Sequence, residues 1–152
     1  MGKYDLVGAV LERCGVEIVF HKIAIKPGKP LWFGMRGRVP VFGLPGNPVS
    51  CLIGFEVFVR PALAKMEGAD PEEWKPLLRL GRWQGAPTSE NPRQQNLPVR
   101  VAQAIDGVDD LEPLRWNSSA DVVGLTRAQG LAVVEAGKIV RTGELVPYRP
   151  LS

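Results

Sequence analysis

The twelve residues from Val39 to Ser50, VPVFGLPGNPVS, constrain the fold of this chain more than any other stretch. β-Branched and aromatic residues at its start predict a short buried strand. Two glycines and a proline within Gly43–Gly46 end that strand. Asn47 is a favourable N-cap, and Pro48 suits the first helical position because its missing N–H would have no helical acceptor. The stretch therefore predicts a strand, a tight turn and the start of a helix, in that order.

The charges around this turn bear on whether it binds a ligand. An ordinary strand-to-helix connection explains the local pattern with no ligand at all. Between Ile18 and Phe55, however, the chain has no Asp or Glu, while it has the cations Lys22, Lys26, Lys29, Arg36 and Arg38. The first N–H groups of a helix carry partial positive charge and suit an anion. The unbalanced charge favours a phosphate or oxyanion site here.

Lys26 to Pro30, KPGKP, predicts a stiff loop, because two prolines remove backbone donors and the glycine permits a sharp turn. Lys26 and Lys29 therefore sit three residues apart on a constrained segment. One interpretation is a solvated surface turn, and the other is a pair of cations that holds one oxyanion. We expect the extended residues that precede both lysines to share a sheet with the strand at Val39 to Phe42.

Composition limits the classes of function. With 152 residues, the chain can form one domain or two small ones. The net charge of +3 is uneven: residues 1–68 have nine Lys and Arg against five Asp and Glu, and the rest has ten against eleven. These cations are too sparse, and too seldom interleaved with aromatics, to predict nucleic-acid binding. No apolar run has transmembrane length and the N-terminus lacks the apolar core of a signal peptide, so we expect no membrane association and a cytoplasmic location.

The cysteines and the histidine exclude most side-chain metal chemistry. Cys14 and Cys51 have no metal-ligand spacing, and each falls in a predicted apolar helix, so we expect two buried, reduced thiols. His21 is the one histidine of the chain, which argues against histidine triads and multi-histidine metal sites. We expect His21 at the surface, at the end of a strand.

The remaining pattern divides the chain into two modules. Residues 1–69 predict a helix with Asp5 as N-cap, strands at 16–20 and 31–33, and a helix from Pro48 that Pro61 kinks or restarts. This is part of an α/β layer with few strands. Residues 70–152 predict a small β-barrel or sandwich. Its candidate strands are 77–83, 96–103, 111–116, 130–135 and a hairpin over 138–148.

Two motifs in this order resemble one known family. They are Lys26–Pro30 with Phe33-Gly34, and Gly43–Ser50, GLPGNPVS. With them, the chain resembles the molybdopterin molybdenumtransferases, the group of MoeA and the gephyrin E domain. The second half is similar too, through Arg93, Leu97–Arg100, Ser118–Asp121, Gly124-Leu125, Ala128 and Gly130-Leu131.

The resemblance implies a fold and a boundary. It implies a partial MogA-like three-layer α/β domain in 1–69 and the family's small carboxy-terminal β domain in 70–152. Family members are much longer, so the chain matches only their carboxy-terminal portion and is interpreted as a fragment, a split gene product or a truncated reading frame. A missing amino-terminal half would account for the small number of strands.

The resemblance also implies an activity. In the family, adenylated molybdopterin and molybdate react, with Mg²⁺, to give molybdenum cofactor and AMP. Carried over by position, Asp5, Lys26 and Lys29 are the catalytic residues, and Asp5 is also the metal ligand, although a plain N-cap role explains Asp5 equally well. The implied cofactor-binding residues are Pro45, Gly46, Asn47, Pro48, Ser50 and Ser119. Val123 and Gly124 replace serines that are frequent in the family.

Three hypotheses therefore stand. The first is molybdenum insertion into molybdopterin. The second is a non-catalytic module that binds molybdopterin or acts as a scaffold and needs the missing half, which a separate chain could supply. The third is a structural fragment with an unpaired sheet edge. The resemblance further implies a homodimer, the usual state in the family.

Overall fold

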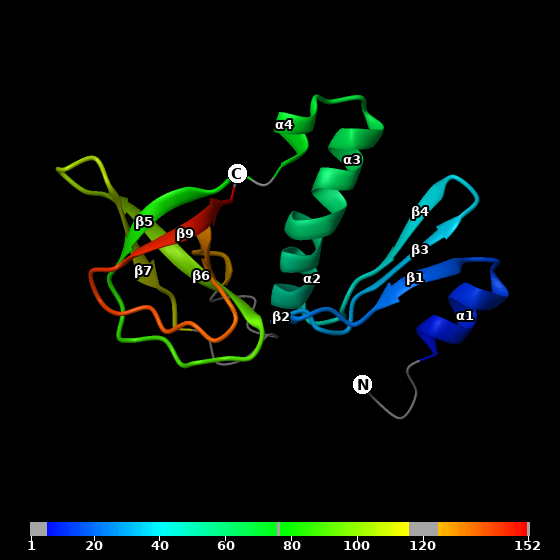
Figure 1. Ribbon diagram of the computed structural model, residues 1–152, viewed down its shortest axis with the longest axis horizontal. Helices are drawn as coiled ribbons and strands as arrows, with labels where there is room; N and C mark the ends of the chain where they lie inside the picture. The colour runs from blue at the N-terminus through cyan, green and yellow to red at the C-terminus, as the bar shows by residue number, and fades with distance from the viewer. Residues whose placement is uncertain (1–5, 76, 116–124, 152) are drawn as a thin grey trace.

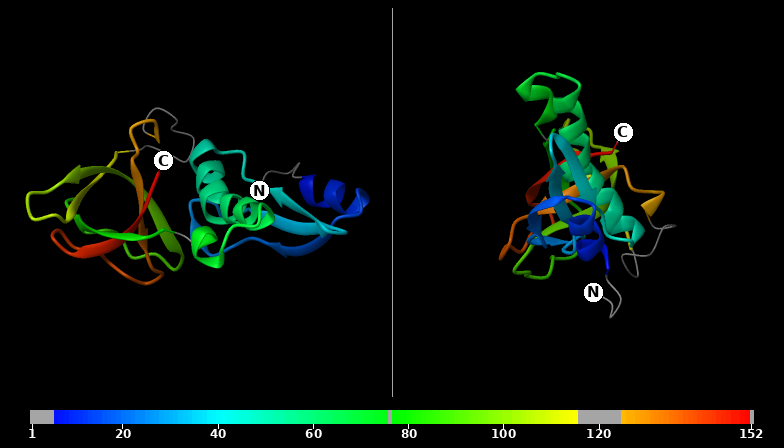
Figure 2. Two further views of the ribbon diagram at one scale, coloured as in Figure 1. Left: turned by 90° about the horizontal axis from the view of Figure 1, so that it is seen from above. Right: turned by 90° about the vertical axis from the view of Figure 1, so that its right-hand side faces the viewer.

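The computed structural model describes residues 6–75, 77–115 and 125–151. A long helix stands between a small sheet and a β-barrel (Figures 1 and 2). In chain order the elements are α1 (Val7–Arg13), β1 (Glu17–His21), β2 (Ile25–Lys26), β3 (Trp32–Arg36), β4 (Val39–Gly43), α2 (Pro48–Gly54), the π-helix η1 (Phe55–Val59), α3 (Arg60–Met66), α4 (Pro71–Trp74), β5 (Arg79–Trp83), β6 (Gln94–Gln103), β7 (Asp109–Pro113), β8 (Gly130–Val134) and β9 (Leu145–Pro150).

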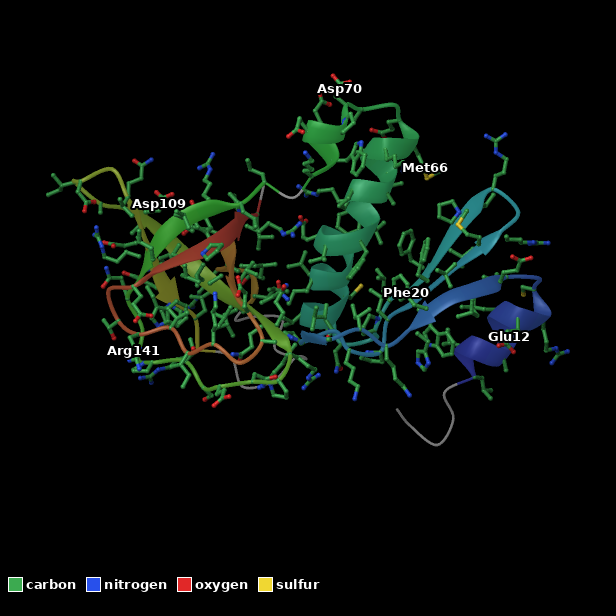
Figure 3. The ribbon with its side chains drawn as sticks, viewed as in Figure 1. Glu12, Phe20, Met66, Asp70, Asp109 and Arg141 are labelled. Atoms are coloured by element: carbon green, nitrogen blue, oxygen red, sulfur yellow. The ribbon has the colours of Figure 1, made fainter. Side chains whose placement is uncertain are left out.

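The small sheet is antiparallel in the order β1-β3-β4. Gly37 forms the β3–β4 turn with a φ of +60°, a conformation that glycine adopts without steric cost. One face of the sheet packs on the long helix through Phe20, whose ring centroid lies 6.2 Å from that of Phe58 (Figure 3). The other face carries Trp32, which contacts α1 at Gly8. The module thus has three layers: helix, sheet and helix.

The long helix consists of α2, η1 and α3, which follow one another without interruption from Pro48 to Met66. It begins as predicted, with Asn47 in the N-cap position and Pro48 in the first turn, although Asn47 makes no side-chain capping hydrogen bond. The π-helical segment lies directly before α3, which carries Pro61 in its first turn. The predicted restart of the helix at Pro61 therefore takes the form of this π segment.

The second module is a closed β-barrel, which decides between the two predicted architectures. Its strands follow the order β6-β7-β5-β9-β8, and antiparallel pairing of β6 with β8 closes the ring. The barrel is filled by apolar side chains that are almost fully buried: Trp83, Val99, Leu111, Ala132, Val134, Val140, Val146 and Tyr148. The Tyr148 hydroxyl donates to Asp109, and burial raises the pKa of Tyr148.

The two modules share a packed junction that local sequence did not predict. Strand β2 pairs in parallel with β6 of the barrel, and not with the sheet that contains Val39 to Phe42, so the expected sheet for the lysine segment was wrong. Ile25 of β2 is buried with Val49 and Ile53 of α2 and Leu131 of the barrel. The junction buries apolar surface from three elements, because β2, α2 and the barrel meet there.

Three further local expectations were wrong. Cys14 is exposed and Cys51 is partly buried, although both are free thiols as expected. Residues 138–141 are not a strand, so the predicted hairpin reduces to β9 and a turn at Thr142-Gly143. Helix α1 has Leu6, and not Asp5, in its N-cap position.

Candidate functional site

A cleft of about 310 Å³ opens at the loop that joins β4 to α2. The loop residues Gly43 to Asn47 form one side of it, and Val7, Pro30 and Trp32 complete the lining. Leu44 packs back on α2, because a Cβ placed at Gly54 would lie 2.9 Å from its Cδ2 atom. Gly46 faces open space, with no atom within 4 Å of the position that its Cβ would take. The loop is therefore supported from below and open at Gly46.

Trp32 is the aromatic residue in the lining of this cleft, and its indole is called the aromatic wall below. Its indole ring stacks on the His21 imidazole, with ring centroids 3.5 Å apart and planes at 11°. His21 ends β1 as predicted, but it is half-buried, and its Nε2 atom is buried with no hydrogen-bond partner among the described residues. Sequence reasoning missed the wall, because only the β1–β3 register shows that residues 21 and 32 are neighbours.

The start of α2 lies next to the cleft. Cys51 donates the first helical hydrogen bond to the Asn47 carbonyl at 2.8 Å, so the amides before Cys51 have no acceptor within the helix. Asn47 lines the cleft, whereas Pro48 does not, and Ser50 is only 4% exposed. Of the predicted binding residues at this turn, the structure brings Pro45, Gly46 and Asn47 to the cleft surface.

The lysine loop packs against the same helical turn. A Cβ placed at Gly28 would lie 3.8 Å from the Ser50 carbonyl oxygen and 3.0 Å from Cδ1 of Ile25. The loop closes on itself, because the Ile23 N–H donates to the Lys29 carbonyl at 2.9 Å. Lys26 and Lys29 are exposed, and neither takes part in the ion pairs found among the described residues. Neither lysine lines the cleft itself.

The barrel borders the lysine loop on its other side. The Arg93 Nη1 group donates to the Ile25 carbonyl at 3.3 Å, one residue before Lys26. The Gln94 N–H donates to the Ala24 carbonyl at 3.0 Å, and Lys26 lies opposite Gln95 in the β2–β6 pairing. Arg93 is thus a third cation beside the two lysines. In the sequence, Arg93 was only one of the residues that carry the family resemblance, and it was not predicted as a site residue. The pairing of β2 with β6 is what brings Arg93 next to the lysine loop.

The described structure does not test two of the predicted site residues, and it shows no site for the predicted metal ion. Asp5 and Ser119 lie outside the described residues. Within the described ranges, no three His, Cys, Asp or Glu side chains are close enough together to hold a metal ion. No helix in this part of the chain is long and apolar enough to cross a membrane.

Two family models match the chain in the order of its modules. The first, described as "Probable molybdopterin binding domain", matches residues 1–65. The second, the MoeA C-terminal region (domain IV), matches residues 82–151. The chain belongs to the MoeA family. The two matches cover the α/β module with its turn and lysine loop, and the barrel with Arg93.

Curated relatives carry one name, molybdopterin molybdenumtransferase. The relative from Haemophilus influenzae is 48% identical over 75 residues, which are 49% of this chain and 18% of that protein. The relative from Synechococcus elongatus is 48% identical over 65 residues, 41% of this chain and 16% of its own length. The Staphylococcus aureus relative is 27% identical over 137 residues, 90% of this chain and 32% of its own. The chain therefore spans about a third or less of these relatives.

Two solved structures of similar proteins show the same fold. The molybdopterin biosynthesis MoeA protein of Pyrococcus horikoshii superposes with a TM-score of 0.78 at 31% identity, over 96% of this chain and 34% of that one. A molybdenum cofactor biosynthesis protein from Pyrococcus furiosus gives a TM-score of 0.71 at 25% identity, over 98% and 55% respectively. The predicted fold class, a partial MogA-like α/β domain followed by a small β-barrel, is confirmed.

Proposed function

We propose that this chain takes part in molybdenum cofactor biosynthesis, as the part of a molybdopterin molybdenumtransferase that holds the anionic substrates. The proposal includes molybdenum insertion into adenylated molybdopterin, with molybdate as the second substrate. It is supported by the names of the relatives and by one observation above all: the Gly28 backbone lies against Ser50, so the lysine loop borders the first turn of α2.

The cleft suits the pterin. Trp32 lines the cleft with an indole ring that His21 stacks on and α1 contacts at Gly8, and planar ligands favour contact with such aromatic surfaces. Pro45, Gly46 and Asn47 also line the cleft, and the open position at Gly46 lets a ligand approach the backbone. Pro30, the last residue of the lysine loop, also lines the cleft.

The cations suit the anionic groups. Molybdate is a dianion and molybdopterin carries a phosphate, and both are stabilised by fixed ammonium and guanidinium groups. Lys26 and Lys29 are held on a closed loop, and Arg93 is anchored beside them by the Ile25 carbonyl. In the proposed roles, these residues bind and orient the substrates and neutralise charge. The amides that open α2 add partial positive charge at the same place. Ser50 is buried in this turn, and neither Ser50 nor Pro48 lines the cleft.

Magnesium does not fit the described part of the site. No carboxylate lies between Ile18 and Phe55, and the described residues hold no cluster of metal ligands. We therefore assign no step to Mg²⁺. The roles of Asp5 as catalytic residue and metal ligand, and of Ser119 in binding, stay predictions.

The test compares Lys26→Ala and Lys29→Ala with the parent chain. Lys138→Ala is the control, because Lys138 is an exposed lysine of the barrel module that forms an ion pair with Glu135. Molybdopterin binding is followed by pterin fluorescence, with and without molybdate. We expect both loop variants to weaken binding by about tenfold or more, since a charge-assisted contact contributes about 1.5–3 kcal/mol. Unchanged binding in both loop variants would refute the assigned role.

The second candidate function is a non-catalytic binding module, favoured by the lack of a carboxylate cluster among the described residues. The discriminating experiment supplies adenylated molybdopterin, molybdate and magnesium to the chain and measures AMP release. Binding without AMP release favours the module. The same assay with the amino-terminal half of a relative added as a second chain tests whether a separate chain can restore AMP release. Gel filtration tests the proposed homodimer, and fractionation of cells tests the proposed cytoplasmic location.

A further inference from the structure

Strand β4 is an outer strand of the small sheet (Figure 1). It pairs with β3 on one side, and no described residue pairs with its other side. The four residues from Val39 to Phe42 are apolar, yet none of them is fully buried, and Val39 is 60% exposed. An apolar strand with bare backbone N–H and C=O groups is a surface on which another strand can pair.

The register of the β3–β4 hairpin shows which backbone groups of β4 point outward. The two-residue turn at 37–38 makes the residues beside it, Arg36 and Val39, a hydrogen-bonded pair. Because such pairs alternate along an antiparallel ladder, the backbone groups of Pro40 and Phe42 point away from β3. Pro40 suits this position, since its missing N–H costs the ladder no bond. The outward groups are therefore the Pro40 and Phe42 carbonyls and the Phe42 N–H.

The opposite edge of the sheet, β1, is less suited to pairing. Its register with β3 shifts between Ile18 and Phe20, so that Val19 is the extra residue of a β-bulge. Lys22, directly after β1, has a φ of +68°. Bulges and charged residues keep edge strands from pairing with other chains. Val19 is 60% exposed, as Val39 is, so the two edges differ in their regularity and not in the exposure of these valines.

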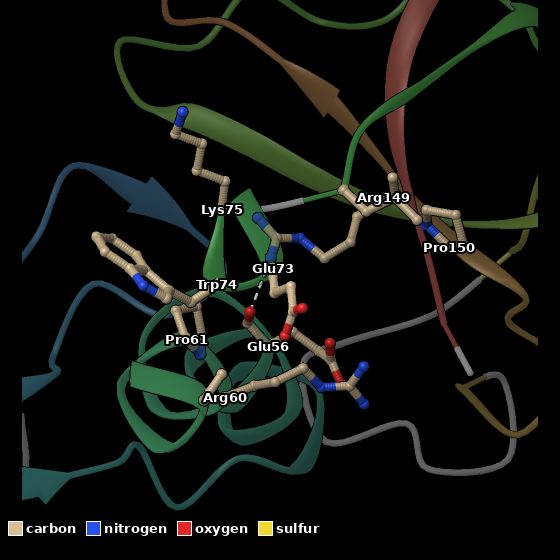
Figure 4. Close-up of a pocket in the computed structure, with 10 residues that line it drawn as sticks. Glu56, Arg60, Pro61, Glu73, Trp74, Lys75, Arg149 and Pro150 are labelled. Carbon is tan, nitrogen blue, oxygen red and sulfur yellow. Dashed lines mark hydrogen bonds and ion pairs between the residues drawn. The ribbon is translucent and has the colours of Figure 1, made fainter. Parts of the chain in front are cut away.

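The barrel is held on the side of the long helix away from this sheet. The π-type donor for the Glu56 carbonyl would be residue 61, which is a proline with no N–H. Arg149 of β9 donates to that carbonyl instead, at 2.7 Å (Figure 4). This contact and the β2–β6 pairing fix the barrel against the helix, and β4 stays open.

The charges at this edge favour an acidic partner. Arg36 and Arg38 are exposed at the hairpin, and neither takes part in the ion pairs found among the described residues. In the sheet and its hairpin they stand against one carboxylate, Glu17, which lies on the far strand β1. A segment with carboxylates beside an apolar strand would therefore be attracted to β4.

The relatives are long enough to supply such a segment. The chain spans 18% of the Haemophilus influenzae relative and 32% of the Staphylococcus aureus relative. Residues 82–151 match the region described as MoeA C-terminal. Most of the additional residues of these relatives therefore lie on the amino-terminal side of the part that this chain matches.

We propose that β4 takes up an additional strand from that amino-terminal part, whether or not the two parts are joined in one polypeptide. The added strand bonds to the outward groups of Pro40 and Phe42, covers Val39, and has acidic residues beside it. Gly43, the last residue of β4, lines the cleft, so the added segment also borders the cleft. The inference concerns assembly and does not depend on molybdopterin binding.

The test co-expresses this chain with the amino-terminal part of the H. influenzae relative, up to the start of the matched region. Light scattering after gel filtration measures the complex, and NMR measures the hydrogen exchange of the Phe42 amide. We expect a one-to-one complex in which this amide exchanges at least about tenfold more slowly than in the chain alone, because its N–H gains an acceptor. A fusion of the same part to Met1 is the second form, in which folding does not depend on association.

Val39→Asp and Val19→Asp are matched variants, since each valine is 60% exposed in an outer strand. Val39→Asp should weaken the complex by about tenfold or more, because the added strand would bury the new carboxylate and its own acidic residues would repel it. Val19→Asp should leave the complex unchanged. In the fusion, Val39→Asp should speed the exchange of the Phe42 amide and Val19→Asp should not.

Four results would overturn the proposal. One is a Phe42 amide that exchanges as fast in the complex, or in the fusion, as in the chain alone. Another is an equal effect of the two Asp variants. A third is the lack of both a complex and slowed exchange in the fusion. The last is a Phe42 amide that self-association protects in the chain alone, since a second copy would then occupy this edge.

Discussion

The His21 imidazole lies parallel to the Trp32 indole, with ring centroids 3.5 Å apart. The two residues are cross-strand partners at the end of β1 and the start of β3. Two glycines make room for the indole: a Cβ at Gly43 would lie 3.0 Å from Cβ of Trp32, and one at Gly8 only 2.4 Å from its Cη2 atom. The aromatic wall of the cleft is therefore held by the sheet on one side and by α1 on the other.

Gly8→Ala should destabilise the chain despite its place in a helix. Alanine gains about 1 kcal/mol of helix propensity over glycine. The 2.4 Å approach to Trp32 outweighs that gain, because overpacking costs about 1–3 kcal/mol when the neighbour is itself held. Urea unfolding measures the difference. In a Trp32→Phe background the cost should shrink, and a Gly8→Ala chain more stable than the parent would contradict the packing around Trp32.

Gly28→Ala should cost about 1–3 kcal/mol of unfolding free energy. Gly28 is buried at a φ of +118°, outside the region that L-residues adopt, and its Cβ would press on Ile25. Gly137→Ala is the matched control, because Gly137 has a φ of +76° and open space around it. Chemical denaturation of both variants checks this. Equal costs at the two positions would mean that packing under the lysine loop contributes nothing.

Pro61→Ala and Arg149→Gln should be strongly non-additive. Arg149→Gln removes the donor to the Glu56 carbonyl and should cost about 1–3 kcal/mol, because a buried acceptor is left unpaired. Pro61→Ala restores an N–H at residue 61 that can serve the same carbonyl, so Arg149→Gln should cost about 1 kcal/mol less in that background. A double-mutant cycle in urea measures the coupling, and additive costs would refute the shared acceptor.

Asp106→Asn should reduce the loss of stability in acid. The Arg82 guanidinium donates to Asp106, and the Val108 N–H donates as well, which together hold the pKa of Asp106 below its usual 3.8. A lowered pKa contributes stability above the unfolded value, and this is lost as the pH falls from about 4 through the folded value. Stability against pH for parent and variant shows the difference. Arg82→Gln should likewise reduce the loss of unfolding free energy at acidic pH. If both variants lose stability in acid as the parent does, the Arg82–Asp106 contact is excluded.

Local chemistry was enough to predict several elements. Asn47 and Pro48 open a helix because their backbone preferences act within one turn, and Gly37 turns the β3–β4 hairpin because it accepts a positive φ. Runs of β-forming residues also predicted the barrel strands, but the strand predicted over 138–141 does not form. That segment has strand-like composition but pairs with nothing in the sheet, because its ends are held by turns.

Contacts between residues that are far apart in the chain could not be predicted from the sequence. Cys14 was predicted buried from apolar neighbours, yet no element covers it in the described structure. Ile25 was assigned to the wrong sheet, since nothing in its own segment distinguishes a partner in β3 from one in β6. The Arg93 contact with the Ile25 carbonyl follows from that same pairing.

The sequence by itself determined the two modules, the Gly-Pro turn before α2 and the family of the chain, since each depends on residues within a short span. Only the tertiary structure decided that the lysine loop lies between α2 and the barrel, that Trp32 walls the cleft and that Arg149 serves the Glu56 carbonyl. The physical reason is that strand pairing and burial join residues far apart in the chain, and one apolar strand is compatible with several partners until the whole core is packed.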